Sequence, residues 1–325
     1  MHEELKFASL IKTCTKKKDL YTGRKLHADI HRRCLLQRSP YLGNTLISMY
    51  IKCGLLAQAE QVHEELSLRN VITWNALISG YAQHGKSNEA LNCLEQMQRE
   101  GISPNVVTFT CILTACSKAG DIGSGEEIHE EIVSRGLLRK DIVLDNALVN
   151  LYAKCGLLEK AQQVLEGIPI RNVVTWASLI AGYTQQGQCR EALSCFIRMQ
   201  NEGISPDAIV FTCIVKACGK SRDIKNGKRI HDEILNRGLL ENDIMLGNAL
   251  VDMYAKCGML EKARRVLDEL CIRNVVTWNA LIAGYVQHGQ GHGALQSFIQ
   301  MQKEGVAPDG VTFICILKSC GSTRD

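Results

Sequence analysis

The sequence predicts an all-α fold, a right-handed α-solenoid superhelix of stacked helix-turn-helix repeats. Three observations support this prediction. One segment of 13 residues occurs three times, as RNVITWNALISGY, RNVVTWASLIAGY and RNVVTWNALIAGY, beginning at Arg69, Arg171 and Arg273. Its apolar residues recur at helical spacing, and no stretch has the alternating pattern of a strand. A folding element that recurs along the whole chain is typical of a repeat array rather than of separate globular domains.

The repeats follow a fixed period. The only tryptophans, Trp74, Trp176 and Trp278, lie 102 residues apart, and each block of 102 residues divides into repeats of 36, 31 and 35 residues. The 36-residue repeats cover residues 4–39, 106–141 and 208–243, the 31-residue repeats cover 40–70, 142–172 and 244–274, and the 35-residue repeats cover 71–105, 173–207 and 275–309. Residues 310–325 begin a further 36-residue repeat. Nine repeats and a fragment therefore fill the chain.

Each repeat is predicted to contain two helices, as the last 35-residue repeat illustrates. Its first helix is expected from about Val276 to His288. One apolar stripe at helical spacing runs along this helix: Trp278, Leu281, Ile282 and Tyr285. A break near Gly289 separates it from a second helix that bears Ala294, Leu295, Phe298 and Met301. Gly305 is placed where a C-terminal cap is expected, with Pro308 just beyond it.

Composition permits a continuous core, because 46% of the residues are hydrophobic and only 22% are charged. No apolar run reaches the roughly 18 residues of a membrane-spanning helix. The net charge of +4 allows a polyanionic partner without predicting one. The N-terminus, MHEELKFASLIKTC, lacks a signal or transit segment, and the C-terminus stops within a repeat. We therefore expect a piece of a longer array.

The 15 cysteines are predicted to pack in the core of a protein from a reducing compartment. Twelve of them occupy repeat positions, in the series Cys14, Cys116, Cys218 and Cys320; Cys111, Cys213 and Cys315; Cys53, Cys155 and Cys257; Cys93 and Cys195. No CxxC pair occurs, so the usual zinc geometry is missing. Free cysteine behaves as a small buried hydrophobe. The sequence predicts no metal and no cofactor.

These repeats resemble a known family. The segment VTWNALIAGYVQHGQGHGALQSFIQMQKEGVAPD is similar to a pentatricopeptide repeat (PPR). The alternating lengths of 35, 36 and 31 residues resemble the P, L and S motifs of the plant PLS subfamily, with TW and GxxP in the P-like repeats, ILTAC or IVKAC in the L-like ones and YAKCG in the S-like ones. The related tetratricopeptide repeat, which binds peptides, has a uniform period of 34 residues.

The resemblance implies binding of single-stranded RNA, with one nucleotide per repeat. The fifth residue of the repeat, together with its last residue, is expected to choose the base, while the second residue packs against the base. Single-stranded RNA exposes the Watson–Crick edges that such a code requires. An Asp at the last position accepts hydrogen bonds and suits bases with a ring N–H, whereas Asn also offers an NH2 group.

The resemblance then assigns a base to most repeats. A pyrimidine is implied by Asn44 with Asn70, Asn75 with Asn105, Asn146 with Asn172, and Asn248 with Asn274; U is implied by Asn279 with Asp309. G is implied by Thr110 with Asp141 and by Thr212 with Asp243, although L motifs read bases less reliably. Ala177 with Asp207 should discriminate weakly with a bias to G, and Ala8 with Ser39 predicts no base. The predicted site is 5′-N-Y-Y-(G)-Y-(K)-(G)-Y-U-3′.

The second-position residues are largely apolar and are expected to clamp the faces of the bases. They are Leu5, Tyr41, Ile72, Val107, Val143, Val174, Ile209, Met245, Val276 and Val311. A second interpretation is that these residues begin helices and fill the core. The two interpretations are compatible.

As a function, the resemblance implies the targeting part of a plant organellar C-to-U RNA-editing factor, in a chloroplast or mitochondrion. Many PLS proteins end in a cytidine deaminase domain, but this chain has no PCxxC to complete the zinc site after its HxE segments. Because His27, His129 and His231 are repeated, they are interpreted as repeat consensus and the chain as non-enzymatic. The alternative function is a scaffold whose concave face or L-like repeats hold a helical protein partner, such as an editing cofactor.

Overall fold

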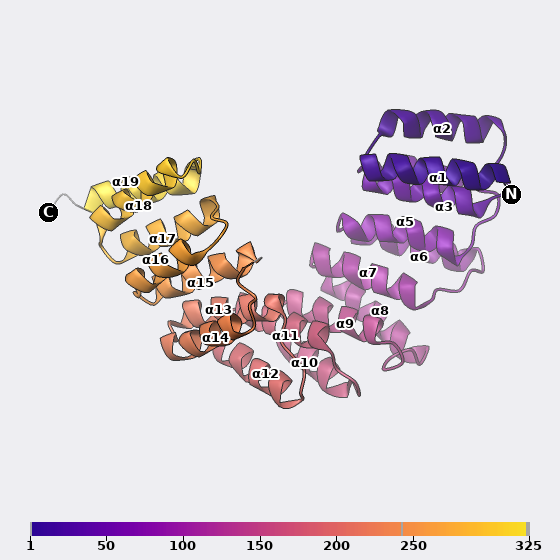
Figure 1. Ribbon diagram of the computed structural model, residues 1–325. Helices are drawn as coiled ribbons and strands as arrows, with labels where there is room; N and C mark the ends of the chain where they lie inside the picture. Colours follow the sequence, from indigo (N-terminus) through magenta and orange to yellow (C-terminus); the bar gives the residue numbers. More distant parts are fainter. Residues whose placement is uncertain (1, 242, 323–325) are drawn as a thin grey trace. The chain divides into compact units, whose positions relative to one another are not determined.

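The computed structural model describes residues 2–241 and 243–322, which form 19 helices joined by short loops (Figure 1). No strand occurs in this part of the chain, so the predicted all-α class of stacked helix pairs is confirmed. The chain divides between Ile170 and Arg171 into two compact parts, the N-terminal half and the C-terminal half. None of the described helices is both long and apolar enough to span a bilayer.

The N-terminal half contains ten of these helices: α1 (His2–Lys17), α2 (Leu20–Arg32), α3 (Pro40–Lys52), α4 (Leu56–Glu64), α5 (Val71–Gln83), α6 (Ser87–Arg99), α7 (Val106–Ala119), α8 (Ile122–Ser134), α9 (Ile142–Lys154) and α10 (Leu158–Gly167). The C-terminal half contains the other nine: α11 (Val173–Gln185), α12 (Cys189–Asn201), α13 (Ala208–Ser221), α14 (Ile224–Asn236), α15 (Ile244–Lys256), α16 (Leu260–Glu269), α17 (Val275–Gln287), α18 (Gly291–Lys303) and α19 (Gly310–Ser322). Odd-numbered helices are the first helices of repeats, and even-numbered helices are the second ones.

The helix ends follow from local sequence. The break expected near Gly289 is present, because Gly289 takes a left-handed conformation (φ 71°) directly after α17. Gly305 does the same (φ 76°) after α18, which confirms the expected C-terminal cap. Glycine adopts positive φ without the steric cost that a Cβ atom imposes.

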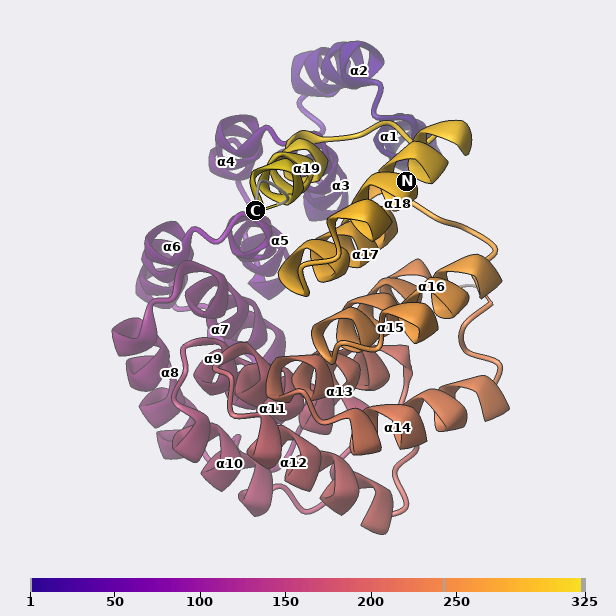
Figure 2. The same ribbon diagram turned by 90° about the vertical axis from the view of Figure 1, so that its left-hand side faces the viewer.

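Within each half, the helices form two layers. The first helices pack on one another in chain order, α1 to α9 in one half and α11 to α19 in the other. Each second helix packs on the first helix of its own repeat and, where the next repeat lies in the same half, on the first helix of that repeat as well. Figure 2 shows α4, α6 and α8 in a row alongside α3, α5 and α7.

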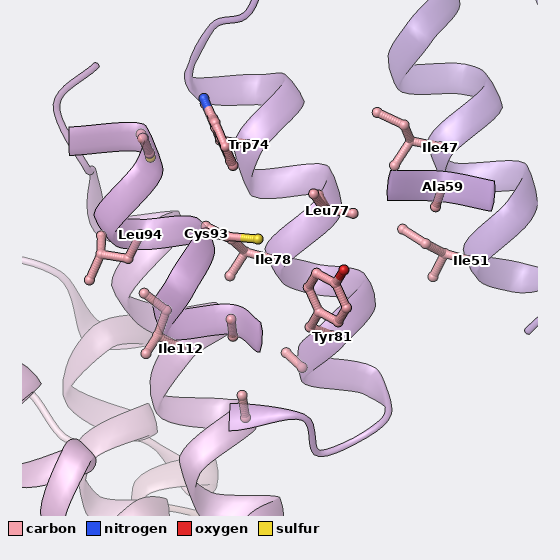
Figure 3. Close-up of a cluster of buried hydrophobic side chains, with 14 of the residues drawn as sticks. Ile47, Ile51, Ala59, Trp74, Leu77, Ile78, Tyr81, Cys93, Leu94 and Ile112 are labelled. Carbon is pink, nitrogen blue, oxygen red and sulfur yellow. The ribbon is translucent and has the colours of Figure 1, made fainter. Parts of the chain in front are cut away.

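The core lies between these layers. The predicted stripe on α17 is confirmed, since all four of its side chains are buried: Trp278, Leu281, Ile282 and Tyr285. Figure 3 shows the sister cluster, in which Trp74, Leu77, Ile78 and Tyr81 lie on α5 between residues of neighbouring helices. Replacing a fully buried tryptophan with alanine typically costs about 3–5 kcal/mol. The repeated TW segment is therefore a principal source of stability.

The repeated arginine before each P-like repeat fastens the loop that leads into it. Arg273 donates to Glu304 at the end of α18 at 2.9 Å, and Arg171 pairs with Glu202 at 3.1 Å. Glu202 also accepts a hydrogen bond from the indole of Trp176 at 3.1 Å. The ion pair thus ties the start of a P-like repeat to the end of the same repeat. The arginine was recognisable in the sequence as part of a motif, but its pairing with the glutamate was not predicted.

The cysteines at repeat positions are buried or half-buried, except for Cys320. Burial raises the pKa of Cys93, Cys116 and Cys218 to about 12, so these thiols stay protonated at neutral pH. Cys34 and Cys271, which fall outside the repeat series, are exposed. The predicted packing role is therefore confirmed for the repeated positions other than Cys320.

Candidate nucleic-acid interface

The last residue of each complete repeat precedes the first helix of the next, where it forms the N-terminal cap. Its side-chain oxygen accepts hydrogen bonds from backbone N–H groups of the first helical turn in the caps Asn70, Asn105, Asp141, Asn172, Asp207, Asp243, Asn274 and Asp309. Asn and Asp are strongly preferred at this position because the first N–H groups of a helix have no partner inside it. These residues were predicted only to read bases, and their capping role was not predicted.

The fifth residue of one repeat reaches the cap of the next helix. Asn75 on α5 donates from Nδ2 to Oδ1 of Asn105 at 3.1 Å. Thr108, the third residue of α7, places its hydroxyl 2.6 Å from Oδ1 of Asn75 and 3.1 Å from Oδ1 of Asn105. The predicted pair therefore does come together, and a buried threonine joins both members. The N-terminal turns of α5 and α7 consequently lie side by side.

The same arrangement recurs at the other end of the chain. Asn279 on α17 donates from Nδ2 to Oδ1 of Asp309 at 2.9 Å, and the hydroxyl of Thr312 lies 2.6 Å from Oδ1 of Asn279. Hydrogen bonds from the backbone N–H of Thr312 and then from Asn279 hold the pKa of Asp309 below its ordinary value. Asp309 is therefore a carboxylate at neutral pH.

Capping fixes which group the last residue turns outward. Oδ1 of Asp309 accepts from Thr312 and Asn279, and Oδ2 remains as a free acceptor among the described contacts. Oδ1 of Asn105 is committed in the same way, to Thr108 and Asn75, and its NH2 group remains as a donor. The Asp cap thus presents an acceptor and the Asn cap presents a donor.

The side-chain amides at the fifth position are largely buried, although they are predicted to contact a base. Asn75 is 8% exposed and Asn279 is 9% exposed. Their polar atoms face the cap and the threonine rather than hydrocarbon. Asn248 is buried too, and its Oδ1 lies 2.5 Å from the hydroxyl of Thr277. Each amide that donates to its cap retains a second N–H, which can meet a base.

The remaining predicted pairs are less complete. Asn44 has a buried Oδ1 without a hydrogen-bond partner among the described residues. In the L-like repeats, Thr212 donates to the carbonyl of Ala208 in its own helix, and the buried hydroxyl of Thr110 is without a partner in the described part of the chain. In the described part of the chain, the hydroxyl of neither threonine donates to its predicted cap, which is Asp141 for Thr110 and Asp243 for Thr212. Of the other predicted residues, Ala177 and Ala8 have no polar group in their side chains, and the side chain of Ser39 makes no capping hydrogen bond. Asn146 lies in the N-terminal half, whereas its predicted partner, the cap Asn172, lies in the C-terminal half.

The second-position residues are exposed, between 45% and 64%, in every repeat: Leu5, Tyr41, Ile72, Val107, Val143, Val174, Ile209, Met245, Val276 and Val311. The interpretation that they fill the core is therefore wrong. They lie on the first turn of the odd-numbered helices, next to the caps. An apolar side chain repeated on the surface at one structural position indicates a binding surface rather than chance exposure.

The repeated histidines have a structural contact in common. Nδ1 of His27, His129 and His231 lies 2.9, 2.7 and 2.9 Å from the hydroxyl of Tyr50, Tyr152 and Tyr254, respectively. Each contact joins the second helix of an L-like repeat to the first helix of the S-like repeat that follows. In the described residues, no cluster of three or more His, Cys, Asp or Glu side chains could hold a metal ion.

Comparison with known sequences places the chain among repeat proteins. A family profile described as "PPR repeat family" matches residues 69–118, 171–239 and 273–322, and one described as "PPR repeat" matches 44–71, 107–137, 146–173 and 248–275. Among the relatives is a mitochondrial pentatricopeptide repeat-containing protein of Arabidopsis thaliana, 36% identical over 98% of this chain and 50% of its own length. A chloroplastic one from the same plant is 34% identical over 98% of this chain and 51% of its own length. The chain spans about half the length of these relatives.

Solved structures share the fold. The pentatricopeptide repeat protein PPR10, crystallised in complex with an 18-nt psaJ RNA element, aligns with a TM-score of 0.74 at 21% identity, over 91% of this chain and 44% of that protein. PPR10 from maize aligns with the same score over 93% of this chain and 44% of its own.

Proposed function

Because the chain belongs to the pentatricopeptide repeat family, we propose that it binds single-stranded RNA with one repeat facing one nucleotide. The observation that carries the proposal is the exposed apolar residue at the second position of every repeat, which lies beside a capped polar pair in the repeats of Asn75 and Asn279. PPR10, which shares the fold, was crystallised with an RNA element.

The apolar row binds the faces of the bases. Val276 on α17 and Val311 on α19 lie on successive first helices and are both half exposed. A base between two such side chains loses apolar contact with water on both faces. In single-strand binders, base stacking contributes roughly 1–3 kcal/mol per nucleotide and tolerates any base. Selectivity must therefore come from the polar groups.

The polar pairs read the edge of the base. At the pair Asn279 and Asp309, the outward N–H of Asn279 donates to a uracil carbonyl and Oδ2 of Asp309 accepts from the uracil N3–H. At the pair Asn75 and Asn105, the outward NH2 of Asn105 meets a ring nitrogen that must be an acceptor. Cytosine N3 is such an acceptor and uracil N3 is not. We therefore narrow the pyrimidine at the Asn75 repeat to C.

The finer assignment is the targeting part of an organellar C-to-U RNA-editing factor of the PLS subfamily. It rests on the repeat lengths of 36, 31 and 35 residues and on relatives named as mitochondrial or chloroplastic. The S-like repeats are short because their second helices are short: α4 has 9 residues and α10 and α16 have 10 each, against 13 in α6. In an editing factor, this array places a separate catalytic domain at a chosen cytidine.

A second function, docking of an editing-factor protein through the L-like repeats, is favoured by one cleft. It has a volume of about 410 Å³ and lies between α8, α9 and α10, with Glu126, His129, Arg139 and Lys160 in its wall. A partner with both acidic and basic side chains would fit this mixed lining.

Binding of labelled oligoribonucleotides tests the main proposal. A 9-nucleotide RNA with the predicted site should bind the chain more tightly than the same RNA annealed to its complement, because pairing hides the Watson–Crick edges. The Lys160→Glu variant, altered in the cleft, should bind the RNA as the unaltered chain does. Equal binding of single and double strands would contradict base reading.

A further inference from the structure

The sequence couples two positions that belong to successive repeats. Where the fifth residue of a repeat is Asn, the third residue of the next repeat is Thr: Asn44 and Thr73, Asn75 and Thr108, Asn146 and Thr175, Asn248 and Thr277, Asn279 and Thr312. Where the fifth residue is not Asn, the third residue of the next repeat is apolar: Ala8 and Leu42, Thr110 and Leu144, Ala177 and Val210, Thr212 and Leu246. This coupling holds at every repeat junction in the chain.

The junction at Ala177 separates this coupling from repeat type. P-like repeats are followed by L-like repeats, and two of the three such junctions carry Asn with Thr, at Asn75 and Asn279. The third junction joins the same repeat types but has Ala177 with Val210. The junction that has no amide at the fifth position also has no hydroxyl at the third position of the next repeat. The threonine is therefore linked to the amide and not only to the start of an L-like helix.

The structure provides the contact that explains the coupling. The hydroxyls of Thr108, Thr277 and Thr312 lie 2.6, 2.5 and 2.6 Å from Oδ1 of Asn75, Asn248 and Asn279, respectively. All three threonines are fully buried. A second contact, to the cap oxygen, is longer at 3.1, 3.0 and 2.9 Å. Because a hydroxyl has one proton, that proton goes to the closer oxygen, which is the one on the fifth-position amide.

The consequence is a fixed amide orientation. Asn75 could turn its amide by 180° and exchange its oxygen for its NH2 group with little change in shape. The Thr108 hydroxyl favours the orientation with Oδ1 inward, which also lets Nδ2 donate to Asn105. In that orientation the base meets an N–H donor. In the reversed orientation it would meet an acceptor, and the preference for the base would change.

One junction shows what happens when the hydroxyl turns elsewhere. Thr73 donates to the backbone carbonyl of Asn70 at 2.8 Å instead of to Asn44. Oδ1 of Asn44 is then buried without a partner among the described residues. The amide of Asn44 lacks the hydrogen bond that fixes the orientation of Asn75 and Asn279.

We propose that the threonine at the third position of a repeat is a positioning residue for base selection by the repeat before it, because it orients the amide that faces the base. This inference rests on the proposed function. It adds a third residue to each reading pair and assigns it to the neighbouring repeat. Thr108, Thr277 and Thr312 have this role for Asn75, Asn248 and Asn279, respectively.

Loss of the hydroxyl tests the proposal. Thr108→Val keeps the shape of the side chain and removes the donor, whereas Thr108→Ser keeps the donor. Two RNAs that differ only in C or U at the nucleotide facing Asn75 give a ratio of Kd values for each protein. Thr108→Val should lower this ratio about fivefold, as expected for one net hydrogen bond, and Thr108→Ser should preserve it. The preference for U at the nucleotide facing Asn279 serves as an internal control and should not change.

Gain of the hydroxyl gives an independent test in another repeat. Ala177→Asn alone introduces an amide beside the cap Asp207 with no threonine to orient it. Ala177→Asn combined with Val210→Thr recreates the set Asn279, Asp309 and Thr312. The double variant should prefer U at this nucleotide, and the single variant should discriminate about fivefold less well. If circular dichroism shows that Thr108→Val is unfolded, the variants at positions 177 and 210 still test whether the threonine positions the amide.

The outcomes separate the two claims. If the unaltered chain discriminates but Thr108→Val keeps its ratio within about twofold, the positioning role is wrong and the proposed function stands. Equal selectivity of the single and double variants at position 177 has the same meaning. If the unaltered chain has no base preference at the nucleotides facing Asn75 and Asn279, both claims are wrong.

Discussion

Among single residues, Asn105 and Asp309 hold the same place in two proposed reading sites that are otherwise alike. Each caps a helix with Oδ1 and accepts from the amide of a fifth-position Asn. They differ only in the group left over, which is NH2 in one and a carboxylate oxygen in the other. Because capping occupies Oδ1, each side chain has only its second polar group available for a base. That group is a donor in Asn and an acceptor in Asp.

This difference predicts a reciprocal exchange. Asp309→Asn should change the preference at its nucleotide from U to C, and Asn105→Asp should change the preference at its own nucleotide from C to U. Both variants keep a capping oxygen, so helix stability should change by less than about 1 kcal/mol. Competition binding with RNAs that differ at one nucleotide measures the exchange. Unaltered preference in both variants would exclude the capped residue as a reader.

The fifth residue should set the size of the base. Asn279→Thr shortens the side chain and leaves room for a purine, while Asp309 still accepts from a ring N–H. Guanine has such an N–H at N1, so the preference of this repeat should move from U toward G. Competition between RNAs with U, G, C or A at that nucleotide measures the shift. Persistent selection of U would mean that Asn279 does not contact the base.

Much of this site was predictable from the sequence, but not how its members touch. Counting from the start of each repeat identified Asn75 and Asn279 and their caps as pairs. The role of Thr108 was missed because it lies in the next repeat, although the coupling between the two positions was visible in the sequence. The burial of the amides could not be predicted, since it depends on how closely successive first helices approach.

At the scale of helices, the ends and apolar stripes followed from glycine positions and 3.6-residue spacing. What the sequence did not reveal was which polar residues are buried. His63 on α4 has its imidazole 4.2 Å, between ring centroids, from Trp74, and its Nε2 is buried without a partner among the described residues. The equivalent residues of the other S-like repeats are Leu165 and Leu267. Burial, with the Arg69 charge as a smaller cause, lowers the pKa of His63 to about 4.

This shift predicts a pH-dependent loss of stability. In the unfolded chain, His63 takes up a proton near pH 6.5, while in the folded chain it stays neutral until about pH 4. The unfolded state binds more protons between these values, so the contribution of His63 to stability falls as the pH falls and is constant below about 4. The loss across this window is on the order of 3 kcal/mol.

His63→Leu, the residue of the sister repeats, is the matched variant. It should be more stable than the unaltered chain by about 1–2 kcal/mol at pH 7, because it removes an unpaired buried nitrogen. The advantage should grow as the pH is lowered toward 4.5. Denaturant unfolding of both proteins at several pH values measures the difference, in which other titrating groups cancel. If the free energies of unfolding of the two proteins change in parallel with pH, His63 is not held in the neutral form by burial.

For the whole molecule, the period of 102 residues was the decisive signal, because it predicted a repeat array and let the positions implied by the family resemblance be counted along the whole chain. Within each half, the proposed reading residues lie on first helices that pack in chain order, and the sequence predicts that order. The sequence does not predict at which repeat junctions the fifth residue is hydrogen-bonded to the cap of the next helix. Two L-like repeats have a threonine at the fifth position, Thr110 and Thr212, yet the hydroxyl of Thr212 is engaged within its own helix.

The balance of contacts predicts weak salt dependence. The net charge is only +4. In the proposed complex, apolar and polar contacts with the base supply most of the binding of each nucleotide. We expect the log of the binding constant to fall with log salt with a slope shallower than about −3, equivalent to roughly four phosphates on a single strand. Titrations with the 9-nucleotide RNA at several salt concentrations measure it. A slope that corresponds to about eight or more phosphates would mean that the backbone dominates.

Selection of RNA from a random single-stranded library by the purified chain tests the central claim most directly. We predict enrichment of 5′-N-Y-Y-(G)-Y-(K)-(G)-Y-U-3′, with C in the third place, facing Asn75, and U in the ninth, facing Asn279. No enriched sequence, or enriched bases whose spacing does not match one nucleotide per repeat, would contradict it.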